Sequence, residues 1–358
     1  MKRASVLVIG TGTIGEPLIG LLADFKKKLG LSEVMFHKRT PLRDEVAKVQ
    51  SLVKRGARLV INQDKVVDFK ALGHKPKYTS FDKALDKAHV IIDCTPAGNE
   101  NRKRHYDKYD ITKHKGKVFI AQGSEKGFGL PYAYGVNDEA LEDMVGSFIQ
   151  VVSCNTHNIS CLIKTLTPNI YDLVSGDFVC IRRANDISQN GSFIASPQVG
   201  AHNDNKFGTH HARDASDLFA TMFQYPNIYS SAMKLNTQYM HVIRFNLTLK
   251  GAADKHHLIS RLRENKFIAL TQKTSANKVF SFGRDHGYYG RIFNQTVIST
   301  PSLAAVSHGG TTQVSGFCFT PQDGNSLLSS VAATMYAIHG QDYKSHMSHF
   351  DDMLFKEI

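Results

Sequence analysis

The stretch VLVIGTGTIG at positions 6–15 decides the fold of this chain. Four apolar residues predict a short buried strand, and glycines follow at once with the spacing GxGxxG. Gly10 then permits a tight turn, Gly12 lets the backbone approach a pyrophosphate, and Gly15 lets a helix pack closely on the strand. Because apolar residues continue at helical spacing to Phe25, the stretch predicts a dinucleotide-binding strand, turn and helix.

Runs of β-branched and other apolar residues recur through the first 150 positions, with amphipathic or charged stretches between most of them. They lie at 6–9, 33–36, 58–61, 90–94, 118–121 and 149–153. Strands of this length joined by crossovers predict a parallel, doubly wound sheet. The pattern changes after Ser153, and the alternation at 240–249 predicts an antiparallel strand with one buried face.

We therefore expect an α/β protein with two domains. A Rossmann domain with a parallel sheet covers 1–152 and binds the dinucleotide. An α+β domain with a mostly antiparallel sheet covers 153–319. A C-terminal helix within about 320–358 packs back on the first domain, because the stretch 326–336 is apolar at helical spacing.

Composition and charge narrow the class of protein. With 358 residues, 42% of them hydrophobic and 21% charged, the chain is neither fibrous nor disordered. The formal net charge of +12 suits anionic small molecules, and it also permits nucleic acid. No signal peptide or membrane-spanning run is visible, which predicts a cytoplasmic protein. The five cysteines show no metal-like spacing, so we expect reduced thiols and no metal site.

The residues after the second strand bear on the choice between NAD and NADP. A site that prefers NAD usually has Asp or Glu at the end of this strand, where the carboxylate binds the ribose hydroxyls. Here His37, Lys38 and Arg39 follow the strand, and no carboxylate stands in that position. Since Lys38 and Arg39 suit a 2′-phosphate, we expect NADP to be preferred, with NAD as the alternative cofactor.

Cys154 is the candidate nucleophile. It follows a strand, and the polar residues Asn155 and Thr156 come directly after it, which predicts a thiol at the start of a helix or turn. A helix N-terminus lowers a thiol pKa, and its amides can hold an oxyanion. The alternative for any cysteine is a buried core residue. We assign the other four cysteines to packing: Cys94, Cys180 and Cys318 within apolar strands, and Cys161 two helical turns beyond Cys154.

Seven short motifs occur in one order along the chain. They are GTGTIG at 10–15, DCTPAG at 93–98, QGSEKG at 122–127, VVSCNT at 151–156, IRRA at 181–184, HHARD at 210–214 and MHVIRFNLTLK at 240–250. Together they span nearly the whole chain, and they resemble those of the archaeal-type (type II) glyceraldehyde-3-phosphate dehydrogenases. The chain departs from that family at Ser124, where the family commonly has glycine, and after Thr156, where the segment is a few residues longer.

The resemblance implies a phosphorylating dehydrogenase that converts glyceraldehyde 3-phosphate to 1,3-bisphosphoglycerate with NAD(P) and inorganic phosphate, in glycolysis or gluconeogenesis. Cys154 would attack the aldehyde carbon, and His241 would be its base. By itself, a histidine on an apolar strand face is more often a core residue, and the resemblance reverses that expectation. It also implies a homotetramer and makes 153–319 the catalytic and oligomerisation domain.

The resemblance assigns further residues to the ligands. The cofactor contacts would be Thr13 and Ile14 at the pyrophosphate, Gly123 and Ser124 at the nicotinamide end, and also Arg183 and Gln322. The substrate contacts would be Ser153, Cys154, Asn155, His211 and Ala212. Arg182 and His210 are the expected phosphate partners, because paired cations and imidazoles suit a triose phosphate.

Two other functions stay open. Aspartate-semialdehyde and N-acetylglutamyl-phosphate reductases combine a Rossmann domain with a nucleophilic cysteine and a histidine, but their substrates carry a carboxylate. The segments at 210–214 and 240–250 favour the phosphate-using family over these reductases. A non-catalytic, basic RNA-binding protein is the second alternative. The net charge permits it, but the chain has no aromatic-rich basic motif of the kind that binds RNA.

Overall fold

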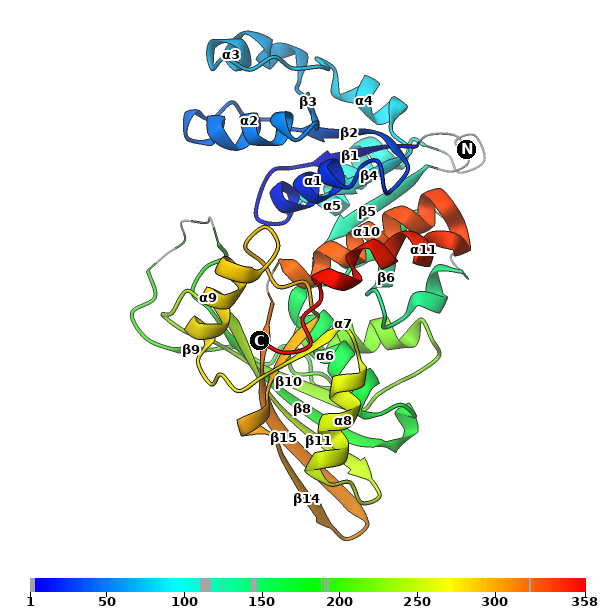
Figure 1. The fold of residues 1–358 in the computed structure, drawn as a ribbon, viewed down its shortest axis with the longest axis vertical. Coiled ribbons are helices and arrows are strands. Elements are labelled where there is room, and N and C mark those ends of the chain that lie inside the picture. The colour runs from blue at the N-terminus through cyan, green and yellow to red at the C-terminus, as the bar shows by residue number, and fades with distance from the viewer. Residues whose placement is uncertain are drawn as a thin grey trace. The chain divides into compact units, whose positions relative to one another are not determined.

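The computed structural model describes residues 4–109, 117–123, 125–142, 147–187, 189, 191, 193–321 and 323–358. By its internal contacts the chain divides into two compact units (Figure 1). Unit 1 consists of Met1–Leu130, Leu141–Val151 and Ser329–His349. Unit 2 consists of Pro131–Ala140, Val152–Leu328 and Phe350–Ile358. Segments that are far apart in the sequence therefore contribute to each unit.

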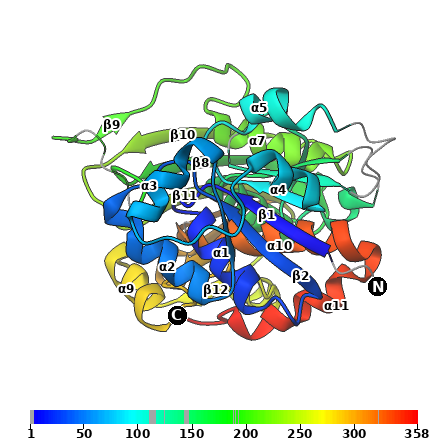
Figure 2. The same cartoon turned by 90° about the horizontal axis from the view of Figure 1, so that it is seen from above.

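Unit 1 contains the parallel sheet that the strand pattern predicts. Its strands are β1 (Ala4–Ile9), β2 (Leu31–His37), β3 (Arg58–Val60), β4 (Val90–Asp93), β5 (Val118–Gln122) and β7 (Phe148–Val151). They lie in the order β3-β2-β1-β4-β5-β7, and each neighbouring pair is parallel. This is a Rossmann order, with β1 and β2 side by side in Figures 1 and 2. The predicted parallel sheet is confirmed.

The helices of unit 1 form between these strands. They are α1 (Gly15–Asp24), α2 (Val46–Lys54), α3 (Val66–Ala71), α4 (Phe81–Lys87) and α5 (Gly98–Asn101), with a 3-10 turn at Arg43–Glu45 before α2. α1 forms because Leu18, Leu21 and Leu22 recur at helical spacing, and all three are fully buried. Pro17 is tolerated because it lies in the first turn, where an N–H would have no intrahelical partner.

The C-terminal segment Ser329–His349 belongs to unit 1. It holds most of α10 (Gly324–His339) and the short helix α11 (Tyr343–Met347). The side-chain amide of Gln122, at the end of β5, donates to Oγ of Ser330 at 2.8 Å. Nε2 of His339 lies 3.3 Å from the carbonyl oxygen of Leu29. These contacts attach the segment Ser329–His349 to the parallel sheet and to the turn before β2.

Unit 2 contains the second sheet, which is mostly antiparallel as expected. Its strands are β8 (Leu173–Arg182), β9 (Gln198–Val199), β10 (Ile228–Lys234), β11 (His241–Lys250), β12 (Ile268–Thr271), β13 (Thr296–Ser299), β14 (Ala304–His308) and β15 (Thr311–Thr320). They lie in the order β12-β13-β15-β11-β8-β10-β9, with β14 paired to β15. The pairs β8–β10 and β12–β13 are parallel. Along β11 the buried residues alternate from His241 to Leu249, which confirms the predicted one-sided strand.

The helices of unit 2 include the one that carries Cys154. They are α6 (Cys154–Leu166), α7 (His210–Ala220), α8 (Lys255–Glu264) and α9 (Ala276–His286), and β6 (Leu130–Tyr132) leads into the unit. Most residues of α6 between Asn155 and Ile163 are buried, so this helix has almost no solvent face. Among the residues that the structure describes, no helix combines the length and apolar character that a membrane crossing requires.

The turn after β4 corrects one prediction about the cysteines. Cys94 was expected within a strand, but β4 ends at Asp93. The Asp93 carboxylate accepts hydrogen bonds from N and Oγ1 of Thr95, at 2.9 and 2.7 Å, and these bonds turn the chain. Cys94 therefore lies in the turn, next to the glycine motif. Cys180 and Cys318 lie within β8 and β15 as predicted, and both are fully buried.

Candidate active site

The glycine turn after β1 has the shape that a dinucleotide requires. Gly10 has a φ of +92°, a conformation that residues with side chains rarely adopt. A Cβ added at Gly15 would lie 2.2 Å from the carbonyl oxygen of Gly10, so α1 can approach β1 only without a side chain there. A Cβ added at Gly12 would meet no atom within 4 Å. The space beside Gly12 is thus open to a ligand, as the fingerprint requires.

Thr13 and Ile14 join this turn to α1. Ile14 occupies the N-cap position, and its side chain makes no capping hydrogen bond. The positive end of α1 therefore has no side-chain cap at this position, which suits an anionic ligand. Gly123 lies at the end of β5 with a φ of +76°, and its carbonyl accepts a hydrogen bond from the side chain of Gln150 at 3.0 Å. Ser124 and Gln322 lie outside the described residues.

The residues at the end of β2 are arranged differently from the expectation. Lys38 is only 7% exposed, and its ammonium group forms an ion pair with Glu45. It also lies 3.5 Å from Oγ1 of Thr11 in the glycine turn. Arg39, by contrast, is exposed. The expectation that no carboxylate stands here is wrong, because the turn before α2 brings Glu45 back to the end of the strand.

Cys154 is the first residue of α6, as predicted. Ser153 is the N-cap, and its Oγ accepts a hydrogen bond from the backbone N–H of Thr156 at 3.4 Å. The side chain of Asn325 donates to the carbonyl oxygen of Cys154 at 2.9 Å. The start of α6 is therefore fixed both by its own cap and by the chain after β15.

The pKa of this thiol differs from the prediction. Burial raises the pKa of Cys154 to about 12, and the carboxylate of Asp323 acts in the same direction. The guanidinium of Arg183 and the backbone N–H of Asn155 act to lower the pKa, but burial outweighs them. The predicted lowering is wrong, because the helix N-terminus and Arg183 do not outweigh the desolvation of the thiolate. The thiol is neutral at pH 7 and needs a base to become a nucleophile.

His241 is the first residue of β11 and is buried. Burial lowers the pKa of His241 to about 3, with the charges of Arg183 and Arg182 acting in the same direction, so the ring is neutral at pH 7. Nδ1 lies 3.3 Å from Oδ1 of Asn155. A carbonyl oxygen can only accept, so Nδ1 carries the proton and Nε2 keeps its lone pair. The imidazole is thus in the form that can accept a proton.

Asn155 links α6 to the second sheet. The resemblance assigns Asn155 to the substrate, and in the structure its side chain is buried and lies against His241. Oδ1 of Asn155 also accepts a hydrogen bond from Oγ1 of Thr320 at 3.2 Å. Thr320 in turn accepts one from the side chain of Asn158 at 2.9 Å. This chain of hydrogen bonds fixes the orientation of the imidazole relative to α6.

Asp323 is a site feature that the sequence did not reveal. It has a φ of +66°, which is strained for a residue with a side chain. Burial raises the pKa of its carboxyl to about 6, against the charges of Arg183 and Arg291. Among the described residues, no group hydrogen-bonds to its Oδ2. The dipeptide Asp323-Gly324 predicts a turn, but no local signal reports that the turn lies beside Cys154.

The two arginines of the IRRA motif line different cavities. Arg182 ends β8 and is exposed, while the Arg183 side chain is 1% exposed. Arg183 donates to Asp186 at 3.3 Å and to the carbonyl oxygen of Tyr239 at 3.4 Å, and its Nε has no partner in the described part of the chain. The Arg183 cavity is about 240 Å³ and is lined also by Ile187, Tyr239, Met240, Phe280, Gly283, Arg284, Gly290, Arg291, Ile292 and Pro321.

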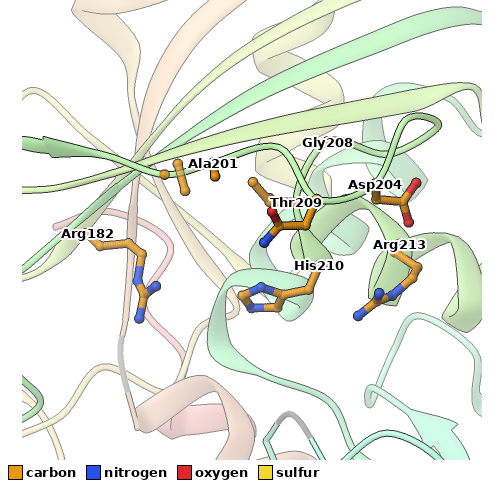
Figure 3. Close-up of a pocket in the computed structure, with 10 residues that line it drawn as sticks. Arg182, Ala201, Asp204, Gly208, Thr209, His210 and Arg213 are labelled. Carbon is orange, nitrogen blue, oxygen red and sulfur yellow. The ribbon is translucent and has the colours of Figure 1, made fainter.

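The Arg182 cavity has the chemistry of an anion site. It is about 390 Å³ and is lined also by Gly200, Ala201, Asn203, Asp204, Gly208, Thr209, His210, Arg213 and Ala232. Figure 3 shows the side chains of Arg182, His210 and Arg213 below the loop that carries Ala201 and Gly208. Arg182 comes from the end of β8, and the other two come from the first turn of α7. Two guanidinium groups and an imidazole at a helix N-terminus favour a phosphate.

Arg213 is a member of this pocket that sequence reasoning missed. It lies within the HHARD motif, three residues after His210, which puts both side chains on one face of α7. This spacing is the sequence signal that could have identified Arg213 as a partner of His210. Burial lowers the pKa of His210, and the charges of Arg182 and Arg213 act in the same direction.

His211 and Ala212 are less exposed than the two phosphate candidates. His211 is 3% exposed, its ring lies 3.9 Å from that of His210, and neither of its nitrogens has a partner in the described residues. Ala212 is fully buried, and its backbone N–H donates to Oγ of Ser230 at 3.0 Å. Both ring nitrogens of His211 are therefore buried and unpaired among the described residues, whereas the amide of Ala212 already has a partner.

Fold and site together define a class of protein. A Rossmann sheet with an open glycine turn accompanies a second, mostly antiparallel sheet, whose unit holds a cysteine at a helix N-terminus and a neutral histidine. This combination is typical of NAD(P)-dependent α/β dehydrogenases.

Comparisons with known proteins agree with this class. The chain is 29% identical to a glyceraldehyde-3-phosphate dehydrogenase of Picrophilus torridus over 268 residues, which is 74% of this chain and 72% of the relative. It is 28% identical to that of Archaeoglobus fulgidus over 80% and 79% of the two chains, and 25% identical to that of Sulfolobus acidocaldarius over 85% and 84%. No family model matches the chain. The resemblance to the archaeal-type enzymes is confirmed, and it extends over most of the chain.

Proposed function

We propose that this protein is a phosphorylating glyceraldehyde-3-phosphate dehydrogenase. It oxidises glyceraldehyde 3-phosphate to 1,3-bisphosphoglycerate with NAD(P) and inorganic phosphate, through a thioester on Cys154. The observation that carries the proposal is the hydrogen bond between His241 and Asn155. That bond leaves Nε2 of a neutral imidazole free to accept a proton, and Asn155 directly follows the neutral thiol.

The proposed reaction begins at Sγ of Cys154. The thiol proton passes to Nε2 of His241 as sulfur bonds to the aldehyde carbon, and the carbonyl oxygen becomes an oxyanion. The backbone N–H of Asn155 and the positive end of α6 stabilise this negative charge. When bound, the nicotinamide supplies the hydride acceptor, and a thioester remains on Cys154.

Inorganic phosphate completes the reaction by attack of its oxygen on the thioester carbon. The carbon–sulfur bond breaks, and the sulfur recovers its proton from His241. We assign the cavity of Arg182, His210 and Arg213 to a phosphate group, because its two guanidinium groups can bind phosphate oxygens in pairs. His211, with unpaired ring nitrogens beside His210, is a further candidate contact of the substrate.

The cofactor assignment rests on unit 1. The open space beside Gly12 and the uncapped start of α1 fit a pyrophosphate, so we assign Gly10, Thr13, Ile14 and Gly15 to the cofactor as well. We propose NADP as the preferred cofactor, because Lys38 and the exposed Arg39 stand at the end of β2. We propose that the cofactor domain consists of residues 1–152 and the C-terminal helix. The catalytic domain, in this proposal, consists of residues 153–319 and belongs to a homotetramer.

The test is NADP reduction in the presence of glyceraldehyde 3-phosphate, with and without inorganic phosphate. Wild type is compared with Cys154→Ser, and Cys161→Ser is the matched control because Cys161 lies buried in the same helix. We expect turnover that requires phosphate, that is lost in Cys154→Ser and that persists in Cys161→Ser.

Each other outcome points to a different function. Turnover without phosphate would indicate a hydrolytic aldehyde dehydrogenase. Bound NADP without turnover would favour a semialdehyde or acyl-phosphate reductase, and aspartate semialdehyde with phosphate would then be assayed. A protein that binds no dinucleotide would leave the RNA-binding alternative. Sedimentation velocity tests the homotetramer in the same samples.

A further inference from the structure

Glu45 occupies an unusual position next to the glycine turn. It ends the 3-10 turn at Arg43–Glu45, and its two carboxylate oxygens bind different lysines. Oε2 pairs with Lys38, and Oε1 accepts a hydrogen bond from Nζ of Lys48 at 2.6 Å. Glu45 therefore bridges a residue at the end of β2 to a residue in the first turn of α2.

The same two lysines hold the glycine turn. Nζ of Lys38 lies 3.5 Å from Oγ1 of Thr11, and Nζ of Lys48 donates to the carbonyl oxygen of Thr11 at 3.3 Å. Thr11 stands between Gly10 and Gly12 of the motif. The carboxylate of Glu45 is thus fixed where β2 ends beside the glycine turn. In a Rossmann fold this is the place of the ribose that bears the 2′-hydroxyl of NAD or the 2′-phosphate of NADP.

Glu45 is ionised at neutral pH. Partial burial acts to raise its pKa, but the hydrogen bonds and charges of Lys38 and Lys48 hold the pKa of Glu45 below its ordinary value. A carboxylate can accept a hydrogen bond from a hydroxyl group, whereas it repels a phosphate. The two lysines have the opposite preference, because each can donate to phosphate oxygens.

We propose that Glu45 is the residue that sets the balance between NAD and NADP. Its carboxylate accepts a hydrogen bond from the free 2′-hydroxyl of NAD. Toward NADP it acts as an internal competitor, because it occupies Lys38 and Lys48, the two cations that the 2′-phosphate would otherwise bind. This inference rests on the proposed cofactor site and adds to it a carboxylate and a second lysine.

The carboxylate of Glu45 is also the counter-ion of the buried Lys38. An ammonium group that is 7% exposed is costly without a counter-ion, and Glu45 supplies one in the free protein. When Glu45 is neutral, Lys38 and Lys48 lose that counter-ion and gain the most from an incoming phosphate. The balance between the two cofactors therefore shifts toward NADP when the carboxylate is removed.

The experiment is calorimetric titration of NAD and of NADP, separately and without aldehyde, into wild type, Glu45→Gln and Lys48→Met. In Glu45→Gln we expect the ratio of the NAD to the NADP dissociation constant to rise about tenfold or more, the size of one charge-assisted hydrogen bond. In Lys48→Met we expect NADP to lose several-fold more affinity than NAD, because only NADP carries the 2′-phosphate that Lys48 would bind. A loss shared by both cofactors would come from the hydrogen bond of Lys48 to the carbonyl oxygen of Thr11.

Glu33→Gln is the matched control. Glu33 lies in β2, and its carboxylate bonds to Lys87 at 2.6 Å and to the hydroxyl of Tyr78 at 2.9 Å. The substitution removes the same charge at the opposite end of β2. We expect an unchanged cofactor ratio in this variant.

An unchanged ratio in folded Glu45→Gln, or a shift toward NAD, overturns the inference. If Glu45→Gln does not fold, Lys48→Met decides, and equal loss of NAD and NADP affinity overturns it. Turnover in the same samples separates the two proposals. A shifted ratio without turnover supports the role of Glu45 and contradicts the proposed dehydrogenase activity. Turnover with an unshifted ratio supports the dehydrogenase activity and contradicts the role of Glu45. Wild type that binds neither cofactor overturns both.

Discussion

The glycine turn predicts opposite effects of two similar substitutions, Gly12→Ala and Gly15→Ala, on cofactor affinity and on stability. A methyl group at position 12 would meet no protein atom within 4 Å, whereas a methyl group at position 15 would lie 2.2 Å from the carbonyl oxygen of Gly10. Gly12→Ala should therefore fill the space of the pyrophosphate without disturbing the protein. Gly15→Ala should instead force α1 away from β1.

The magnitudes follow from these distances. Ordinary contact begins at 3.4 Å, so Gly15→Ala needs a shift of about 1.2 Å between backbone segments. Overpacking of this kind costs about 1–3 kcal/mol, which lowers Tm by roughly 1–4 °C in a protein of 358 residues. Gly12→Ala should change Tm by no more than about 1 °C, because only the chain entropy of the unfolded state changes. Its dissociation constant for NADP should rise at least about tenfold, since a blocked phosphate contact costs 1.4 kcal/mol or more.

Differential scanning fluorimetry gives the two Tm shifts, and calorimetric titration gives the affinity for NADP. Wild-type affinity in Gly12→Ala would refute the reasoning, because the open space would then not be the pyrophosphate site. A Gly15→Ala protein as stable as wild type would show that α1 does not need its close contact with β1.

Three further predictions concern titrating groups. Because burial raises the pKa of Cys154 to about 12, its alkylation by iodoacetamide should keep accelerating up to pH 10, and a plateau near the free-cysteine value of about 8.5 would contradict this. Asp323→Asn should lower the Cys154 pKa and speed alkylation at a fixed pH, whereas an unchanged rate would show that Asp323 has no influence on the thiol. Burial lowers the pKa of His37 and of His157 from 6.5 to about 4, so the unfolded chain binds more protons between these values and stability should be lost as pH falls from 6.5 toward 4. The loss is at most about 3 kcal/mol for each ring. The urea midpoints of unfolding at pH 7 and pH 4.5 measure this loss of stability. In His37→Gln the difference between the two midpoints should be smaller than in wild type. Equal midpoints in wild type at the two pH values would contradict the prediction.

Local patterns in the sequence were sufficient to predict the two sheets, the helix after the glycine turn and the position of Cys154 at the start of a helix. The GxGxxG turn, the β-branched runs and the alternation along β11 are short-range patterns whose physical cause is local, namely burial of one face and the backbone freedom of glycine. The position of Cys154 at the start of α6 was readable for the same reason, because a strand end and polar residues flank it. The role expected of His241 came from resemblance, since its strand pattern alone is that of a core residue.

The electrostatics of the site required the tertiary structure. The sequence predicts a low pKa for Cys154 from the helix N-terminus. Desolvation of the thiol and the charge of Asp323, which is 169 positions further along the chain, raise the pKa instead. Glu45 is seven residues from Lys38, and only the turn before α2 brings its carboxylate onto that lysine. Desolvation and charge pairing depend on which atoms surround a group in space. For this protein the sequence by itself determined the fold class and the chemical groups available, whereas the three-dimensional packing decided their charge states and partners.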